Sequence, residues 1–193
     1  LNKGIEQASG HLIAYLNSDD YYLPGSLEAV AKAWQKNPDA DLFHGRCRYV
    51  NETGEKIGEQ FGNITQFKEI IDLWGVWWKR RQFVQPEVFW TKRITEKIGK
   101  FREDLYYVMD YDYWCRILQA GGQVQPINKE LTCFRLTAEQ KSNESETVAQ
   151  ELLAVVKPIL WQEKKLIPRS LRLKLQGQWL FQVVWRKVAD RSI

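Results

Sequence analysis

The sequence predicts an α/β fold, in which a sheet is flanked by helices, and two observations carry the prediction. Apolar, β-prone runs of strand length at residues 11–16 and 41–50 are separated by a segment with helical spacing of apolar residues at 26–36. Such alternation is typical of α/β domains. The 193 residues, of which 44% are hydrophobic and 27% charged, are enough for the core of one domain of ordinary size.

The first part of the chain is expected to contain six elements. They are the end of a helix at 1–9, strands at 11–16, 41–50 and 56–61, and helices at 26–36 and 65–73. Ser26 and Thr65 suit the N-caps of the two later helices, and Pro38 ends the first of them. Turn-forming residues at 51–54 join two of the strands into a hairpin.

The second part continues the alternation. Its expected elements are a strand at 85–90 that enters a helix at Thr91, a loop at 99–105, a helix from Asp110 to about Gly121, short strands at 123–127 and 130–135, a helix from Asn143 to about Glu163, and a last helix from Pro168. Asn143 and Glu146 have the spacing of a capping box. Pro158 is expected to kink or split the helix that contains it.

Two adjacent carboxylates mark a candidate site. Asp19 and Asp20 follow the strand at 11–16, and Pro24 breaks the chain after them. In open α/β sheets, ligands bind at the carboxyl ends of the strands. Adjacent acids repel each other, and a hard cation such as Mg²⁺, which takes carboxylate oxygens and substrate phosphates, would relieve that repulsion. A solvated turn explains the same residues, because Asp and Ser favour turns.

Aromatic and basic side chains gather at residues 74–81. Trp74, Trp77 and Trp78 stand beside the basic run 79–81. As the lip of a groove they could stack a sugar and hold a phosphate or an acidic lipid. The same pattern fits a helix end with a basic face, whose long side chains reach water while their stems stay buried.

Two further acids, Asp110 and Asp112, lie in the first turn of a predicted helix. The helix dipole alone favours acids at this position. A carboxylate that points out of the helix start would also serve as a general base, provided that it reaches the proton it removes.

Composition excludes several classes of protein. Cys47, Cys115 and Cys133 are widely separated, which argues against a zinc site and a disulfide framework and fits a reducing compartment. No apolar run is long enough to cross a bilayer. The net charge of +4 is concentrated from Lys164 onward, where eight basic residues are accompanied by one acidic residue, Asp190. Nucleic-acid binding, which needs a basic face on the folded domain, is therefore not expected.

Five pieces of the sequence, in order, resemble the inverting family 2 glycosyltransferases of GT-A fold. They are Asn2-x-Gly4 and Ala8-x-Gly10 leading to Leu16-Asn17-Ser18-Asp19-Asp20 and Pro24, then Gln85-Pro86-Glu87-Val88-Phe89-Trp90, then Gly99-x-Phe101-x-Glu103-x-Leu105, then Asp110-Tyr111-Asp112-Tyr113-Trp114-x-Arg116, and last Phe134-Arg135-Leu136-Thr137 with Lys141-Ser142. The resemblance covers residues 1 to about 142. It implies a Rossmann-like mixed sheet flanked by helices; the C-terminal tail, expected to be helical from its own pattern, lies outside the resemblance.

The resemblance also implies a reaction. A sugar would pass with inversion from a nucleotide-diphosphate-sugar to the hydroxyl of a saccharide, lipid-linked or protein acceptor, in polysaccharide or glycoconjugate synthesis. Asp19 would bind Mg²⁺ or Mn²⁺ against the donor diphosphate. Asp110 would deprotonate the acceptor, and Asp112 is the second candidate for that base. The residues implied to contact the substrates are Asn17, Ser18, Asp20, Trp78, Gln85, Trp114, Arg135 and Lys141.

Some positions depart from the family pattern. Asn17 stands where the family usually has an acid, Met109 where an acid often precedes the catalytic one, and Thr137 in place of a common histidine. The strand–helix–strand units that open family members and bind the nucleotide are missing, so we expect an exposed sheet edge and no catalysis by this stretch alone. These departures leave open a non-catalytic sugar- or membrane-binding member of the same fold.

Two regions are expected along the chain, a GT-A domain at 1–142 and a helical extension at 143–193 that is basic from 164. The basic, Trp-containing tail could lie on an anionic membrane surface near a lipid-linked acceptor. It could equally pack against the domain and keep a solvated basic face. The expected location is the cytoplasm, with peripheral contact at the inner membrane face.

Overall fold

The computed structural model describes residues 1–137, 145–162, 167, 169–174 and 176–177. Its strands are β1 Leu12–Ile13, β2 Tyr21–Tyr22, β3 Leu42–Val50, β4 Lys56–Phe61, β5 Val88–Thr91 and β6 Val124–Arg135. Its helices are α1 Asn2–Gln7, α2 Ser26–Lys36, α3 Phe67–Ile70, α4 Lys92–Ile98, α5 Met109–Gln119 and α6 Ser145–Gln162, with a π-helix at Trp74–Trp78 and a 3₁₀ helix at Gln85–Glu87.

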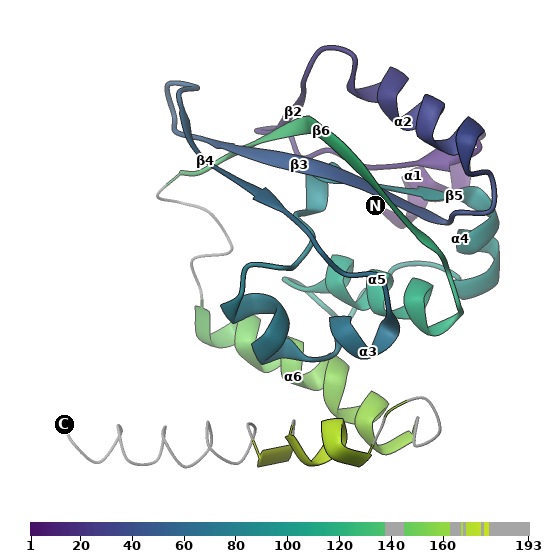
Figure 1. Cartoon of the computed structure of the whole chain (residues 1–193), viewed down its shortest axis with the longest axis vertical. Coiled ribbons are helices and arrows are strands. Elements are labelled where there is room, and N and C mark those ends of the chain that lie inside the picture. Colours follow the sequence, from purple (N-terminus) through teal and green to yellow (C-terminus); the bar gives the residue numbers. More distant parts are fainter. Residues whose placement is uncertain (138–144, 163–166, 168, 175, 178–193) are drawn as a thin grey trace.

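The strands form one mixed sheet in the order β1-β5-β3-β6-β2, with β4 paired to β3. Only β3 and β6 run parallel among the described pairs, and the others are antiparallel. Helix α2 covers one face of the sheet, and α3 and α5 cover the other (Figure 1). The predicted α/β class is therefore confirmed.

Each face of the sheet has its own apolar core. On the α2 side, Val30 packs with Phe43, Phe89 and Leu131. The larger core lies on the opposite side and joins the sheet to α4, α5 and α6; its buried members include Leu42, Trp90, Ile94, Tyr113, Ile117 and Val155. Alternate residues of β3, such as Leu42 and Phe43, belong to opposite cores, as the pleat of a strand requires.

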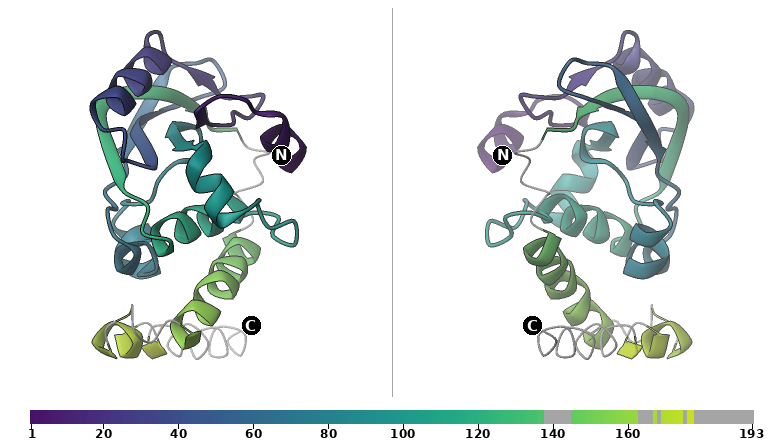
Figure 2. Two further views of the ribbon diagram at one scale, coloured as in Figure 1. Left: turned by 90° about the vertical axis from the view of Figure 1, so that its right-hand side faces the viewer. Right: turned by 90° about the vertical axis from the view of Figure 1, so that its left-hand side faces the viewer.

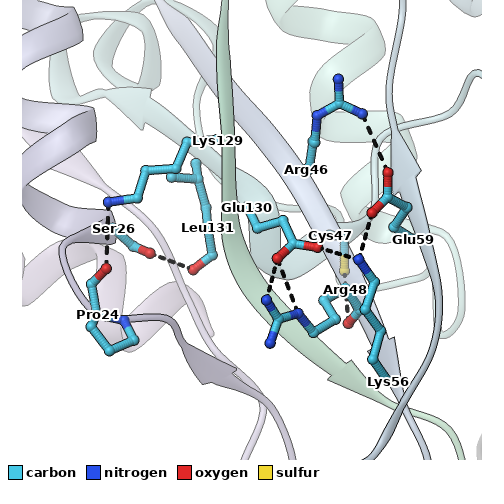
Figure 3. Close-up of polar contacts among 10 residues, drawn as sticks. All are labelled: Pro24, Ser26, Arg46, Cys47, Arg48, Lys56, Glu59, Lys129, Glu130 and Leu131. Atoms are coloured by element: carbon cyan, nitrogen blue, oxygen red, sulfur yellow. Dashed lines mark hydrogen bonds and ion pairs between the residues drawn. The ribbon is translucent and has the colours of Figure 1, made fainter.

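Strand β6 corrects the prediction of two short strands at 123–127 and 130–135. It is continuous, because register shifts opposite β3 around Arg46 absorb the irregular stretch between the two predicted strands. Gly45 permits this approach, since a Cβ there would lie 2.4 Å from Leu131 Cγ. Charged pairs then connect three strands: Glu130 of β6 accepts from Arg48 Nε of β3 at 3.1 Å and from Lys56 Nζ of β4 at 2.7 Å (Figure 3).

Two predicted helix caps are wrong. Gly25, with a φ of 72°, precedes α2, and Ser26 Oγ instead donates to the Leu131 carbonyl at 2.6 Å, which ties α2 to β6 (Figure 3). Gln66 rather than Thr65 caps α3, where Glu69 completes a capping box. The predicted cap Thr91 is confirmed, since its side chain accepts from the Ile94 N–H.

Helix α6 lies beyond α3 and α5, on the side away from α2 (Figures 1 and 2). Its Leu152, Val155 and Val156 are buried in the larger core. The Glu151 carboxylate accepts three backbone N–H groups of residues 106–108, at 3.0, 2.8 and 3.0 Å. The helix is not split at Pro158.

The sequence also predicted an N-cap for α6 and a basic helical tail after it. The predicted cap Asn143 and most of the basic tail lie outside the described residues. In the part of the chain that the structure describes, no helix combines the length and the apolarity needed to cross a bilayer.

Candidate active site

The acid turn follows β1, where the chain leaves the sheet. The predicted strand at 11–16 is shorter than expected, because the Tyr15 carbonyl accepts from Gln85 Nε2 at 2.6 Å instead of from a neighbouring strand. Gln85 Oε1 in turn accepts from Asn17 Nδ2 at 3.1 Å. The 3₁₀ helix before β5 therefore positions the start of the turn.

Asp20 holds the turn from within. Its side chain is 7% exposed, and its two oxygens accept from the Arg135 N–H at 3.0 Å and from Asn17 Nδ2 at 3.4 Å. Burial raises the pKa of Asp20 to about 6, although these hydrogen bonds oppose the rise. Asp19 and Ser18 are exposed. The two adjacent acids thus have different environments, and Asp19 is the one that faces solvent.

Arg135 connects the acid turn to the β3–β4 hairpin. Its Nε donates to the Asp19 carbonyl at 3.3 Å, and its Nη1 donates to the carbonyls of Asn51 and Glu52 at 3.2 and 2.8 Å. The guanidinium predicted to contact the substrates therefore contacts backbone carbonyls in this structure. Lys141, predicted for the same role, lies outside the described residues.

The two acids at the start of α5 also differ. Asp110 is half-buried, accepts the Tyr111 N–H at 2.7 Å, and burial raises its pKa to about 6. Asp112 is 5% exposed and accepts from Arg116 Nε at 2.8 Å, and its other oxygen lies 3.6 Å from Arg102 Nη1. Residues two apart point to nearly opposite sides of a helix. Asp112 therefore contacts the neighbouring loop and lies outside the cleft.

An open cleft of ≈1190 Å³ brings the candidate residues together. The sequence-predicted residues that line it are Asn17, Asp19, Gln85, Asp110 and Trp114. Trp114 is 4% exposed and packs edge-on against Phe83, with centroids 5.6 Å apart, so it forms part of the wall. Ser18, Asp20, Asp112 and Arg135 are not among the described lining residues.

The cleft has further aromatic and basic lining that the site prediction omitted. These residues include Tyr15, Tyr49, Trp77, Arg80 and Tyr106. Burial, and then the charge of Asp110, raise the pKa of Tyr15. The Trp and basic run at 74–81 was a signal for Trp77 and Arg80. Trp78 lies in the π-helix, and its side chain is outside the described part.

The carboxylates of the cleft fit one type of metal site. In the described part of the chain, no group of three or more His, Cys, Asp or Glu side chains could hold a metal ion. Mg²⁺ commonly binds through one or two carboxylates together with substrate phosphates and water. The exposed, cleft-lining Asp19 suits such a site, which the nucleotide would complete, and it does not suit an all-protein cage.

The mixed sheet, with an acid turn at the end of a strand and a second carboxylate that lines the same open cleft, fits the GT-A class of transferases. The family model for glycosyl transferase family 2 matches residues 1–119. The chain belongs to glycosyl transferase family 2.

Its relatives agree with this assignment. An uncharacterized glycosyltransferase, MJ1057 of Methanocaldococcus jannaschii, is 30% identical over 135 residues, which are 70% of this chain and 45% of the relative. YwdF, an uncharacterized glycosyltransferase of Bacillus subtilis, is 24% identical over 60% of this chain and 41% of its own length. The chain therefore spans less than half the length of these two relatives.

A solved structure shows the same fold. S. aureus TarS (residues 1–349) in complex with UDP-GlcNAc superposes with a TM-score of 0.63 at 13% identity, covering 93% of this chain and 50% of that one. The predicted GT-A fold is confirmed.

Proposed function

We propose that this chain contributes the catalytic half of an enzyme that transfers a sugar, with inversion, from a nucleoside-diphosphate-sugar to a hydroxyl acceptor. One observation carries the proposal: Asp19 and Asp110, far apart in sequence, line one cleft. The TarS fold, which binds UDP-GlcNAc in that protein, supports a UDP-sugar as the first donor to test.

Asp19 is proposed as the metal ligand. When bound there, Mg²⁺ or Mn²⁺ would neutralise negative charge on the departing diphosphate. Asp20 supports this role, because it accepts hydrogen bonds from the Arg135 N–H and from Asn17 Nδ2 and so ties the turn to β6. Asn17 and Gln85, bonded to each other and lining the cleft, are proposed to offer polar groups to the donor. Ser18 is proposed to contribute from the exposed tip of the turn.

Asp110 is proposed as the general base. With a pKa of about 6 it is mostly ionised at pH 7, yet it remains basic enough to accept a hydroxyl proton. As the proton moves to Asp110, the acceptor oxygen bonds to the anomeric carbon. The bond from that carbon to the diphosphate oxygen breaks, and its electron pair leaves with the diphosphate. Attack opposite the leaving group inverts the anomeric centre.

Asp112 is the less suitable base, because Arg116 and Arg102 occupy its carboxylate. We propose that it positions α5. The acceptor is proposed to be a saccharide, lipid-linked or protein hydroxyl, and the place of action the cytoplasm or the inner membrane face. A non-catalytic sugar-binding member of the family is the second candidate, and the amide of Asn17 at a position usually acidic in the family favours it.

The test is calorimetric titration of UDP, GDP and dTDP, with and without Mn²⁺, into the full-length protein. Asp19→Ala should abolish the metal-dependent part of binding, and Asp39→Ala, which removes another exposed carboxylate, should leave it unchanged. Equal binding by wild type and Asp19→Ala, or no nucleotide binding at all, would contradict the metal-diphosphate site. The non-catalytic candidate would then be preferred.

A further inference from the structure

The backbone of Arg80 is unusual. With a φ of 50°, Arg80 is the one non-glycine residue of positive φ in the described part of the chain. Such strained positions persist only where their surroundings impose them, and they cluster at functional sites. Arg80 also closely follows the π-helix Trp74–Trp78, and π-helical turns are frequent at functional sites.

Contacts on both sides impose this conformation. The Arg80 N–H donates to the Trp77 carbonyl at 3.2 Å. The next residue, Arg81, is anchored by its N–H to the Val76 carbonyl at 2.8 Å and by its guanidinium to Glu69 Oε1 at 3.2 Å. Arg81 therefore has a structural role, and the strain is concentrated at Arg80.

Arg80 gives the cleft a positive charge. Of the described residues that line the cleft, it is the one basic residue, and none of the ion pairs in the described part of the chain includes it. The acids on the lining are Asp19, Asp110 and Glu59, and Glu59 is already paired with Lys56 at 2.6 Å. The Arg80 guanidinium is thus available to a ligand.

The position of Arg80 separates it from the acid turn. Its charge acts on Tyr49 of β3, where it opposes the rise in pKa that burial causes. The cleft lining on this side includes residues 57–60 of β4, which pairs with β3. The acid turn is instead hydrogen-bonded to Arg135 of β6, which is a different neighbour of β3. A donor held at Asp19, on the β6 side of β3, leaves the β4 side of the cleft for the second substrate.

An aromatic face accompanies this charge. Trp77 lines the same cleft, is 37% exposed and meets Tyr111 edge-on, with centroids 6.4 Å apart. Exposed aromatic faces suit the apolar faces of sugar rings. A guanidinium pairs with a carboxylate or phosphate through two parallel hydrogen bonds.

We propose that Trp77 and Arg80 form an acceptor subsite for a sugar that carries a negatively charged group. Trp77 packs against the sugar ring, and the Arg80 guanidinium pairs with the charged group. The carboxylate of a uronic acid and the phosphate of a sugar phosphate share this chemistry. The inference rests on the proposed function, because it assigns the donor to the Asp19 side of the cleft.

The test measures sugar binding to the full-length protein saturated with Mn²⁺ and its nucleoside diphosphate. Ligand-observed NMR would compare glucuronic acid, glucose 6-phosphate and methyl glucoside on wild type, Arg80→Gln and Lys79→Gln. The last variant is a matched control, since Lys79 is exposed, adjacent and not among the described lining residues. Wild type and Lys79→Gln should prefer one or both anionic sugars over methyl glucoside by about tenfold. Arg80→Gln should lose that preference and keep its nucleotide affinity.

The outcomes separate this inference from the function on which it rests. If wild type binds a nucleotide but shows no anionic preference, or if Arg80→Gln retains that preference, the subsite is refuted and the proposed function is not. If Arg80→Gln mainly weakens nucleotide binding, Arg80 contacts the diphosphate of the donor, and the acceptor subsite is also refuted. If wild type binds no nucleotide, both proposals fail. The response to glucuronic acid or to glucose 6-phosphate identifies the charged group.

Discussion

Replacing Asp110 with Asn tests the proposed base directly. Because burial raises the pKa of Asp110 to about 6, about nine tenths of its carboxylate is ionised at pH 7 and about one tenth at pH 5. A base acts in its ionised form, so activity should be lost as the pH falls through 6. Transfer by the wild type should therefore be about tenfold slower at pH 5 than at pH 7.

The variant should remove both the activity and this dependence. General-base catalysis contributes about 10²–10⁴-fold, so kcat of Asp110→Asn should fall by that factor, with its residual rate nearly flat between pH 5 and 7. Asp112→Asn is the matched control: it should lower stability by about 1–3 kcal/mol, because it disrupts the hydrogen bond to Arg116, and it should keep the pH profile.

The assay follows release of the nucleoside diphosphate at saturating donor and acceptor, in the full-length protein. Asp20 also has a pKa of about 6, so metal-dependent nucleotide binding must be titrated over the same pH range to separate the two groups. A wild-type rate that is flat from pH 5 to 7, or an Asp110→Asn variant within a few fold of wild type, would refute the assignment of Asp110.

Three further predictions concern stability. Gly45→Ala should cost about 1–3 kcal/mol in urea unfolding, since its Cβ would lie 2.4 Å from Leu131 Cγ; an unchanged midpoint would contradict the tight β3–β6 approach. Arg80→Gly should raise the unfolding free energy by about 0.5–1 kcal/mol, because glycine adopts a φ of 50° without strain, and a lower melting temperature would count against strain there. Glu130→Gln should cost up to about 1 kcal/mol at neutral pH, because Arg48 and then Lys56 lower the pKa of that carboxyl to about 2; the difference from wild type should vanish as the pH falls from 4.5 to about 2, and a constant difference would refute the pairing.

Local sequence was sufficient for the elements whose causes are local. Helix α2 and strand β4 have the predicted bounds, because apolar spacing defines the helix and turn residues define the hairpin. The predicted cap at Ser26 was wrong because the partner of its side chain is distant in the sequence. Ser26 satisfies a carbonyl of β6, a partner 105 positions away along the chain, and local capping rules cannot anticipate such a contact.

The sequence by itself determined the family, the GT-A fold and the two acid pairs, because these follow from short motifs in a set order. Tertiary structure alone decided which member of each pair faces the cleft. Asp20 and Asp112 are engaged by Arg135 and Arg116, while Asp19 and Asp110 line the cleft. The fold brings together residues that are distant in the sequence, and so the environments of these carboxylates differ. Burial and hydrogen bonding set the pKa of a carboxylate, and no sequence motif specifies either of them.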